Sequence, residues 1–233
     1  HREGISRPSL TYWRDAMGRL VKNRVALVCL VFIIILLLSC ILLPFFSPFS
    51  SREQHLAETN QGLFSAFVDE RFEGQNAVHI FGTDKLGRDM WTRTFEGGRV
   101  SLMIAFAAVF VNLIIGMIYG GVSGYFGGVV DNVMMRIVEI VNGIPYLIVV
   151  LLLMMVLPKG TFSMVVAYAT VGWTGMARLV RGQALSLKNQ EFVVAAEAMG
   201  AKASRIIAKH LLPNALSVII INVTLAVPSA IFT

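Results

Sequence analysis

One uninterrupted apolar run constrains this chain more than any other feature of its sequence. Residues 25–43 hold no charged side chain over nineteen positions, and an α-helix needs about 20 such residues to cross the hydrocarbon core of a bilayer. Within that core, a lone segment is stable only as a helix, which satisfies its own backbone hydrogen bonds. The run therefore predicts a membrane-spanning helix, and the rest of the chain must be divided between the two sides of a membrane.

Four further apolar segments follow, at about residues 101–121, 137–157, 162–179 and 215–232. The chain is 56% hydrophobic and only 15% charged, which is too apolar for a soluble domain. We therefore expect an all-α, polytopic membrane protein with five spans. A basic arm (1–24) precedes the first span (25–43), a polar segment (44–100) follows it, and residues 101–233 form the transmembrane core.

The distribution of Lys and Arg predicts the orientation of these spans. Basic residues are concentrated in the arm 1–24 and between residues 178 and 209, whereas the segment 44–100 is slightly acidic. Basic loops favour the cytoplasmic side, so we expect a cytoplasmic N-terminus and an extracytoplasmic segment 44–100. The net charge of +6 is then a consequence of topology. Because the basic residues are split among loops, a nucleic-acid-binding patch is a poor interpretation.

The segment 189–213 is neither apolar enough to span a bilayer nor turn-like enough to be a loop. Its first half has apolar and small residues at helical spacing, with Asn189 as a candidate N-cap and Gly200 where the helix should stop. A second short helical pattern runs up to Pro213, which suits the first turn of the next helix. We expect two short helices hinged at Gly200. An amphipathic helix lying on the membrane surface is the alternative interpretation.

The polar segment holds a second distinctive stretch at residues 81–89, FGTDKLGRD. Gly82 and Gly87 allow turns, Thr83 or Asp84 could cap a following helix, and Asp84 could pair with Arg88 at i,i+4. A turn with a surface ion pair is all that these residues predict by themselves.

Small and polar residues within the spans predict how the helices pack. Gly116, Gly120 and Gly124 recur every four residues, a spacing that lets helices approach closely in lipid. Pro145 and Pro228 should kink their spans. Cys29 and Cys40 lie about 16 Å apart along one helix, too far for a disulfide, and we interpret them as buried thiols.

A few polar side chains are candidates for the translocation path: Asn112, Glu139 and Asn142. For Glu139, an interfacial ion pair with Arg136 is favoured over a role in the path. For Asn112 and Asn142, as for Asn222, hydrogen bonding between helices is favoured and path lining comes second.

Several motifs together resemble one known family. The stretch 81–89 followed by GRVSL at 98–102, SGYFGG at 123–128, ARLVRGQ at 177–183 and LLPN at 211–214 are similar to the C-type permease subunit of dipeptide and oligopeptide ABC importers, within the binding-protein-dependent transport system inner membrane component family. The segment 189–213 resembles the cytoplasmic coupling loop of such permeases, with Val194 in place of the usual glutamate before two alanines. The resemblance covers nearly the whole chain in matching order.

The resemblance implies a type I ABC importer permease fold with six spans, one more than this sequence contains. It implies a bacterial inner-membrane subunit that forms half of a translocation path for peptides. Its partners would be a homologous B-type permease subunit, two cytosolic ABC ATPases, an extracytoplasmic peptide-binding protein and membrane lipid. The residues expected to contact an ATPase are Glu191, Phe192, Ala195, Ala196, Met199, Gly200 and Ala201.

Motifs for chemistry are missing from the sequence. It has no G-x₄-G-K-[ST] phosphate loop, no H-E-x-x-H, no G-x-S-x-G and no Cys/His cluster. We therefore expect a non-enzymatic chain without cofactors, with ATP and Mg²⁺ bound by the partner ATPases. A self-sufficient secondary transporter or channel is the alternative, and Glu139 is its lone candidate for ion coupling. A membrane assembly scaffold is a weaker third possibility.

Overall fold

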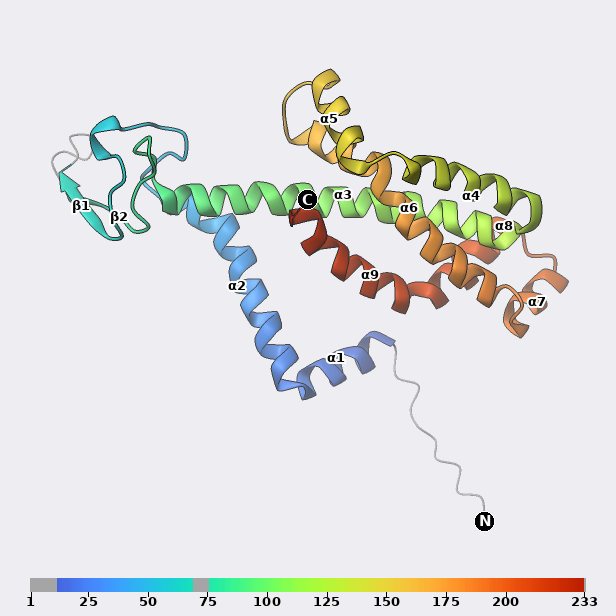
Figure 1. Cartoon of the computed structure of the whole chain (residues 1–233). Coiled ribbons are helices and arrows are strands. Elements are labelled where there is room, and N and C mark those ends of the chain that lie inside the picture. Colours follow the sequence, from blue (N-terminus) through green and yellow to red (C-terminus); the bar gives the residue numbers. More distant parts are fainter. Residues whose placement is uncertain (1–11, 69–75, 233) are drawn as a thin grey trace, which may run out of the picture. The chain divides into compact units, whose positions relative to one another are not determined.

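The computed structural model describes residues 12–68 and 76–232 (Figure 1). These residues divide into two units, with the boundary between Arg99 and Val100. Part of the predicted basic arm (1–11) and part of the polar segment (69–75) lie outside the described residues. Apart from one two-stranded hairpin, the regular structure of the described residues is helical. The predicted all-α class is confirmed on this basis.

The first unit begins with two helices, α1 (Tyr12–Lys22) and α2 (Arg24–Phe46). Asn23 separates them and caps α2, because its Oδ1 accepts a hydrogen bond of 3.2 Å from the backbone N–H of Ala26. α2 has no buried residue, as a helix facing lipid or a partner would. It contains the predicted first span but continues through Pro44, where we expected it to end.

The polar segment that follows is folded. It contains the short helix η1 (Leu56–Glu58) and the antiparallel strands β1 (Ser65–Val68) and β2 (Asn76–His79), with Ser65 opposite His79. Its predicted end lies near residue 100, where the boundary between the two units also falls. α3 (Met90–Phe126) begins ten residues earlier and is 37 residues long, which is about 55 Å at 1.5 Å per residue.

The second unit contains the later part of α3 and six further helical elements. They are α4 (Gly128–Gly143), α5 (Tyr146–Val156), α6 (Thr161–Leu187), α7 (Glu191–Ala198), α8 (Ala203–Ile206) and α9 (Leu212–Phe232), with the π-helical turn η3 (Ile207–Leu211) between α8 and α9.

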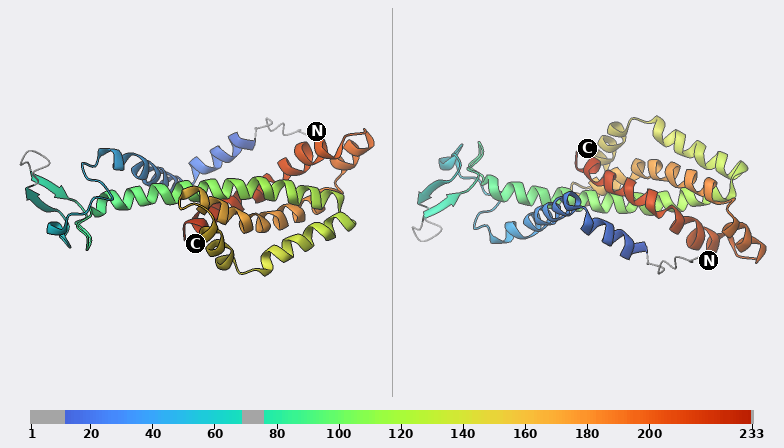
Figure 2. Two further views of the ribbon diagram at one scale, coloured as in Figure 1. Left: turned by 90° about the horizontal axis from the view of Figure 1, so that it is seen from above. Right: turned by 90° about the horizontal axis from the view of Figure 1, so that it is seen from below.

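The predicted third span, 137–157, is not one straight helix. α4 and α5 meet at a bend of 79° (Figure 2), with Pro145 immediately before α5. Pro145 cannot donate a backbone hydrogen bond and disfavours helical geometry at the residue before it. The predicted kink at Pro145 is therefore confirmed, as a break. Asp131 lies in the first turn of α4.

By length and composition, three described helices can cross a membrane: Arg24–Phe46, Met90–Phe126 and Ala203–Phe232. A fourth is added if α4 and α5 count as one span. The predicted fourth span lies in α6, which is long enough but not apolar enough to be counted. The reason lies in its surroundings: α6 buries residues along its whole length against the other helices, so small and hydroxyl side chains replace large apolar ones.

The glycine series of α3 packs against α6, as its spacing predicted. A Cβ added at Gly120 would lie 2.3 Å from the backbone oxygen of Ala177, and one added at Gly124 would lie 2.6 Å from the Cβ of Ala184. Any side chain at these positions would separate the two helices. The close approach of α3 and α6 therefore depends on glycine at these positions, because glycine has no side chain beyond a hydrogen atom.

Candidate coupling site and membrane interior

The short helix α7 has a buried face and an exposed face. Val193 and Ala196 are buried at 0% and 3% exposure, whereas Phe192 and Met199 are 40% and 81% exposed. Ala195 lies on the exposed side as well. Ala196 thus packs inside this chain in the structure, so it does not supply the close approach to another protein that we expected of both alanines.

The buried face anchors α7 to the rest of the second unit. Val193 and Ala196 share one hydrophobic cluster with Ala184 of α6, Ile206 of α8 and Leu211 of η3. Because interiors are close-packed, a displacement of α7 must also displace the ends of α6 and α9. The buried face of α7 therefore holds it against the end of the helix bundle.

Gly200 ends α7 as predicted, with φ of +79°. The N–H of Gly200 bonds to the carbonyl of Glu197 at 2.9 Å, and the N–H of Ala201 bonds to that of Ala196 at 3.0 Å. This pair of bonds is the Schellman motif, which favours glycine because the backbone is left-handed. The N-cap is Gln190 and not Asn189, with Glu191 exposed in the first turn.

The predicted second short helix does not stop at Pro213. α8, η3 and α9 form one run from Ala203 to Phe232. In η3 the N–H of Leu212 bonds to the carbonyl of Ile207, five residues back. Such a π-helical turn shifts the bonding pattern just before Pro213, which has no N–H to donate. The second half of the loop is therefore a direct extension of the last span.

A buried ion pair connects α4 to α6, and the sequence analysis did not identify it. Asp131 of α4 accepts two hydrogen bonds of 2.5 Å from Nε and Nη2 of Arg181 in α6, and a third of 2.5 Å from the hydroxyl of Ser123 in α3. The side chain of Asp131 is 8% exposed and that of Arg181 is 34% exposed. Together with Ser123, the pair links three helices. Only the joint presence of an acid and a base beside apolar segments could have suggested it, since they are 50 residues apart.

The predicted path residues have different environments. Glu139 pairs with Arg136 at 2.7 Å and both are exposed, which confirms the ion pair. Asn142 accepts a hydrogen bond of 3.0 Å from Thr174, which confirms bonding between helices. Asn112 differs: it is 7% exposed, and its Oδ1 has no hydrogen-bond partner within the described residues.

In the first unit, the stretch 81–89 forms a tight loop. Asp84 accepts hydrogen bonds from the N–H groups of Leu86 and Arg88 and from the Arg88 side chain, so the predicted pair is confirmed. The side-chain hydrogen bond from Arg88 lowers the pKa of Asp84 to about 2. Gly82 and Gly87 both have φ near +70°, and a Cβ at Gly87 would collide with the His55 backbone.

The helix cap is neither of the residues that we expected. Asp89 accepts hydrogen bonds of 2.7 Å from the N–H and the hydroxyl of Thr92, at the start of α3. The other carboxylate oxygen of Asp89 lies 2.7 Å from Nδ1 of the buried His79. The loop, the hairpin and the start of α3 are thus held by one set of polar contacts.

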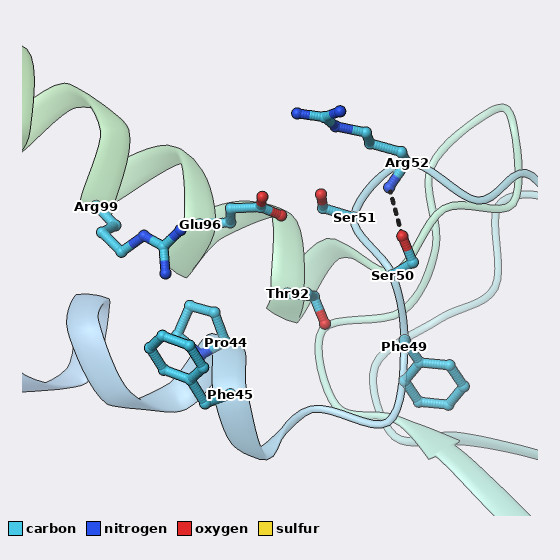
Figure 3. A pocket seen from close by; sticks show the side chains of 9 residues that line it. All are labelled: Pro44, Phe45, Phe49, Ser50, Ser51, Arg52, Thr92, Glu96 and Arg99. Carbon is cyan, nitrogen blue, oxygen red and sulfur yellow. Dashed lines mark hydrogen bonds between the residues drawn. The ribbon is translucent and has the colours of Figure 1, made fainter.

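A surface cavity of about 260 Å³ lies in the same unit (Figure 3). Aromatic side chains line it together with Arg52, Glu96 and Arg99, and the guanidinium of Arg99 lies 5.4 Å from the ring centre of Phe45. Its mixed lining suits a polar contact surface.

These features first define a class: a helical protein that crosses a membrane several times. The family described as binding-protein-dependent transport system inner membrane component matches residues 112–233, and the N-terminal TM domain of oligopeptide transport permease C matches residues 11–62. The chain belongs to the family of binding-protein-dependent transport system inner membrane components.

Curated relatives match along almost the whole chain. It is 46% identical to the dipeptide transport system permease protein DppC of Bacillus subtilis, over 99% of this chain and 68% of the relative. It is 44% identical to the oligopeptide transport system permease protein OppC of the same organism, over 99% and 72%. It is 39% identical to the oligopeptide transport system permease protein OppC of Haemophilus influenzae, over 94% of this chain and 67% of the relative. The resemblance to C-type permeases that the motifs indicated is confirmed.

Proposed function

We propose that this chain is the C-type permease subunit of an ATP-driven importer in a bacterial inner membrane and forms half of a path for dipeptides or oligopeptides. The substrate class comes from the names of the relatives. The mechanism rests on one observation: α7 exposes Phe192 and Met199 while its other face is packed against the ends of α6 and α9.

The proposed coupling proceeds through this element. α7 docks in a cleft of a cytosolic ATPase, with Phe192 and Met199 as apolar anchors and Ala195 allowing close contact. Glu191 and Ala201 border the contact, while Ala196 holds α7 to its own bundle. When the ATPase closes on ATP, α7 moves as a rigid piece and carries α6 and α9 with it.

The complete transporter then needs further chains. A homologous B-type permease forms the other half of the path, two ABC ATPases bind ATP and Mg²⁺, and an extracytoplasmic protein delivers peptide. The folded first unit offers the cavity in Figure 3 as part of the surface that receives the binding protein. The N-terminus is cytoplasmic in this proposal.

Co-purification followed by vesicle transport tests the function. The tagged subunit should retain an ABC ATPase pair, and vesicles containing the complex should accumulate labelled peptide when ATP and the binding protein are supplied. Accumulation should persist when the proton gradient is collapsed while ATP is maintained. Uptake that follows the proton gradient instead would identify a secondary transporter, and a complex without any flux would identify a scaffold.

A further inference from the structure

The second unit contains a cavity of about 310 Å³ between α3, α6 and α9. This volume is at the lower end of the range for small-molecule sites, about 300–1,000 Å³. Asn112, Gly172 and Asn222 line it, and each falls near the middle of the apolar segment of its helix. The cavity is therefore at the depth where transporters of several folds hold their substrates.

The lining of the cavity combines apolar side chains with polar side chains that carry no charge. Asn112, Asn222, Tyr168 and Ser229 contribute amides and hydroxyls, and no charged side chain of the described residues lines it. Amides and hydroxyls both donate and accept hydrogen bonds. A lipid chain would need none of these groups, and an ion would require charged ligands or converging carbonyls.

Asn112 provides the strongest indication of a ligand. A buried polar atom without a partner costs free energy, and native structures contain few of them. The Oδ1 of Asn112 is such an atom, and its residue lines the cavity. The Oδ1 atom is itself buried, so a small rotation of the Asn112 amide brings this unpaired acceptor to a donor in the cavity.

Gly172 maintains this arrangement. A Cβ added there would lie 2.3 Å from Nδ2 of Asn112, so even alanine would push the amide away from its present position. The contact is with the end of a flexible side chain, which can move at little cost to the fold. Gly172 thus leaves room for one particular placement of the Asn112 amide.

We propose that this cavity is a subsite of the translocation path that binds the peptide backbone, with the side-chain amide of Asn112 as its hydrogen-bonding group. This inference rests on the proposed function. Because its lining is uncharged, the subsite binds the backbone, which all peptides share, and does not discriminate between peptides by side-chain charge.

The test uses the complete transporter in vesicles with saturating binding protein, and compares Asn112→Leu and Gly172→Ala with the parent. Gly182→Ala is the matched control, because Gly182 lies on the same helix as Gly172 and an added Cβ there meets nothing within 4 Å. Maximal uptake of trialanine should fall about tenfold in both test variants, the scale of one lost hydrogen bond. Trilysine and triglutamate should lose uptake by the same factor.

Thermal stability separates this proposal from a purely structural role. Asn112→Leu removes an unpaired buried polar group, so its melting temperature should equal or exceed that of the parent while transport falls. Parent-like uptake by Asn112→Leu, or a loss that depends on side-chain charge, would overturn the subsite. A parent complex that imports no peptide at all would refute the proposed function, and the subsite with it.

Discussion

The ion pair between Asp131 and Arg181 permits a prediction with a definite asymmetry. Asp131 is almost fully buried, whereas a third of the Arg181 side chain reaches solvent. Replacing Arg181 by Ala leaves an uncompensated carboxylate inside the bundle, and breaking a buried pair in this way costs about 3–5 kcal/mol. Replacing Asp131 by Ala leaves a cation that can still reach water, so that cost should be about 1–3 kcal/mol.

The double variant should be less destabilised than the sum of the two single variants, because neither charge is then left alone. The pair of Arg136 and Glu139 is the matched control. Its closest N–O distance is 2.7 Å, against 2.5 Å in the buried pair, but its side chains are 76% and 61% exposed. Its two single substitutions should each cost less than about 1 kcal/mol.

The assay is equilibrium unfolding of the purified variants in mixed micelles. It should rank Arg181→Ala as the least stable variant and give a coupling energy for the buried pair that exceeds that of the exposed pair. Equal costs for Arg181→Ala and Asp131→Ala, or fully additive effects, would refute the reasoning. The stability of the fold would then not depend on the charge of Arg181 beside Asp131.

Three further predictions follow from other parts of the chain. Gly120→Ala should lower stability by about 1–3 kcal/mol, since α6 must retreat from the new methyl group, whereas Gly97→Ala on the same helix meets no atom and should be neutral or stabilising in a melting experiment. Asp84→Asn should lower the melting temperature of the first unit at pH 7. The pKa of Asp84 is lowered in the fold, so the ionised carboxylate stabilises the fold above pH 3.8 and this stabilisation is lost on protonation. The difference in melting temperature between variant and parent should therefore disappear as pH falls from about 4 to about 2. A cysteine introduced at Lys188 should escape an impermeant reagent applied outside intact cells; labelling there would reverse the topology.

The sequence predicted the features that depend on local rules. The stop at Gly200 follows from its backbone conformation, and the contact of α3 with α6 follows from a glycine every fourth residue. Motif order was enough to indicate the family. The stop at Gly200 and the spacing of the glycines are both set by residues within a few positions of each other.

The features that were missed depend on tertiary contacts. Ala195 and Ala196 look alike in sequence, but only the packing of α7 shows that Ala196 is buried. Asp89 is the N-cap of α3, because Asp84 instead accepts a hydrogen bond from the N–H of Arg88 within the loop. The sequence predicted a span at residues 162–179, but α6 buries one face along its length against other helices and is less apolar than the helices that can cross a membrane.

The central claim is that the element from α7 to Gly200 transmits ATPase closure to the spans. The most direct measurement is peptide uptake beside ATP hydrolysis in reconstituted vesicles, for Gly200→Glu and for the control Lys202→Glu. An added Cβ at Gly200 meets nothing within 4 Å, so the effect must come from the left-handed backbone that glycine permits and from the contact surface. Gly200→Glu should assemble but lose transport, or hydrolyse ATP without transport, while Lys202→Glu stays near the parent. Transport and hydrolysis at parent rates by Gly200→Glu would show that α7 is only a surface helix.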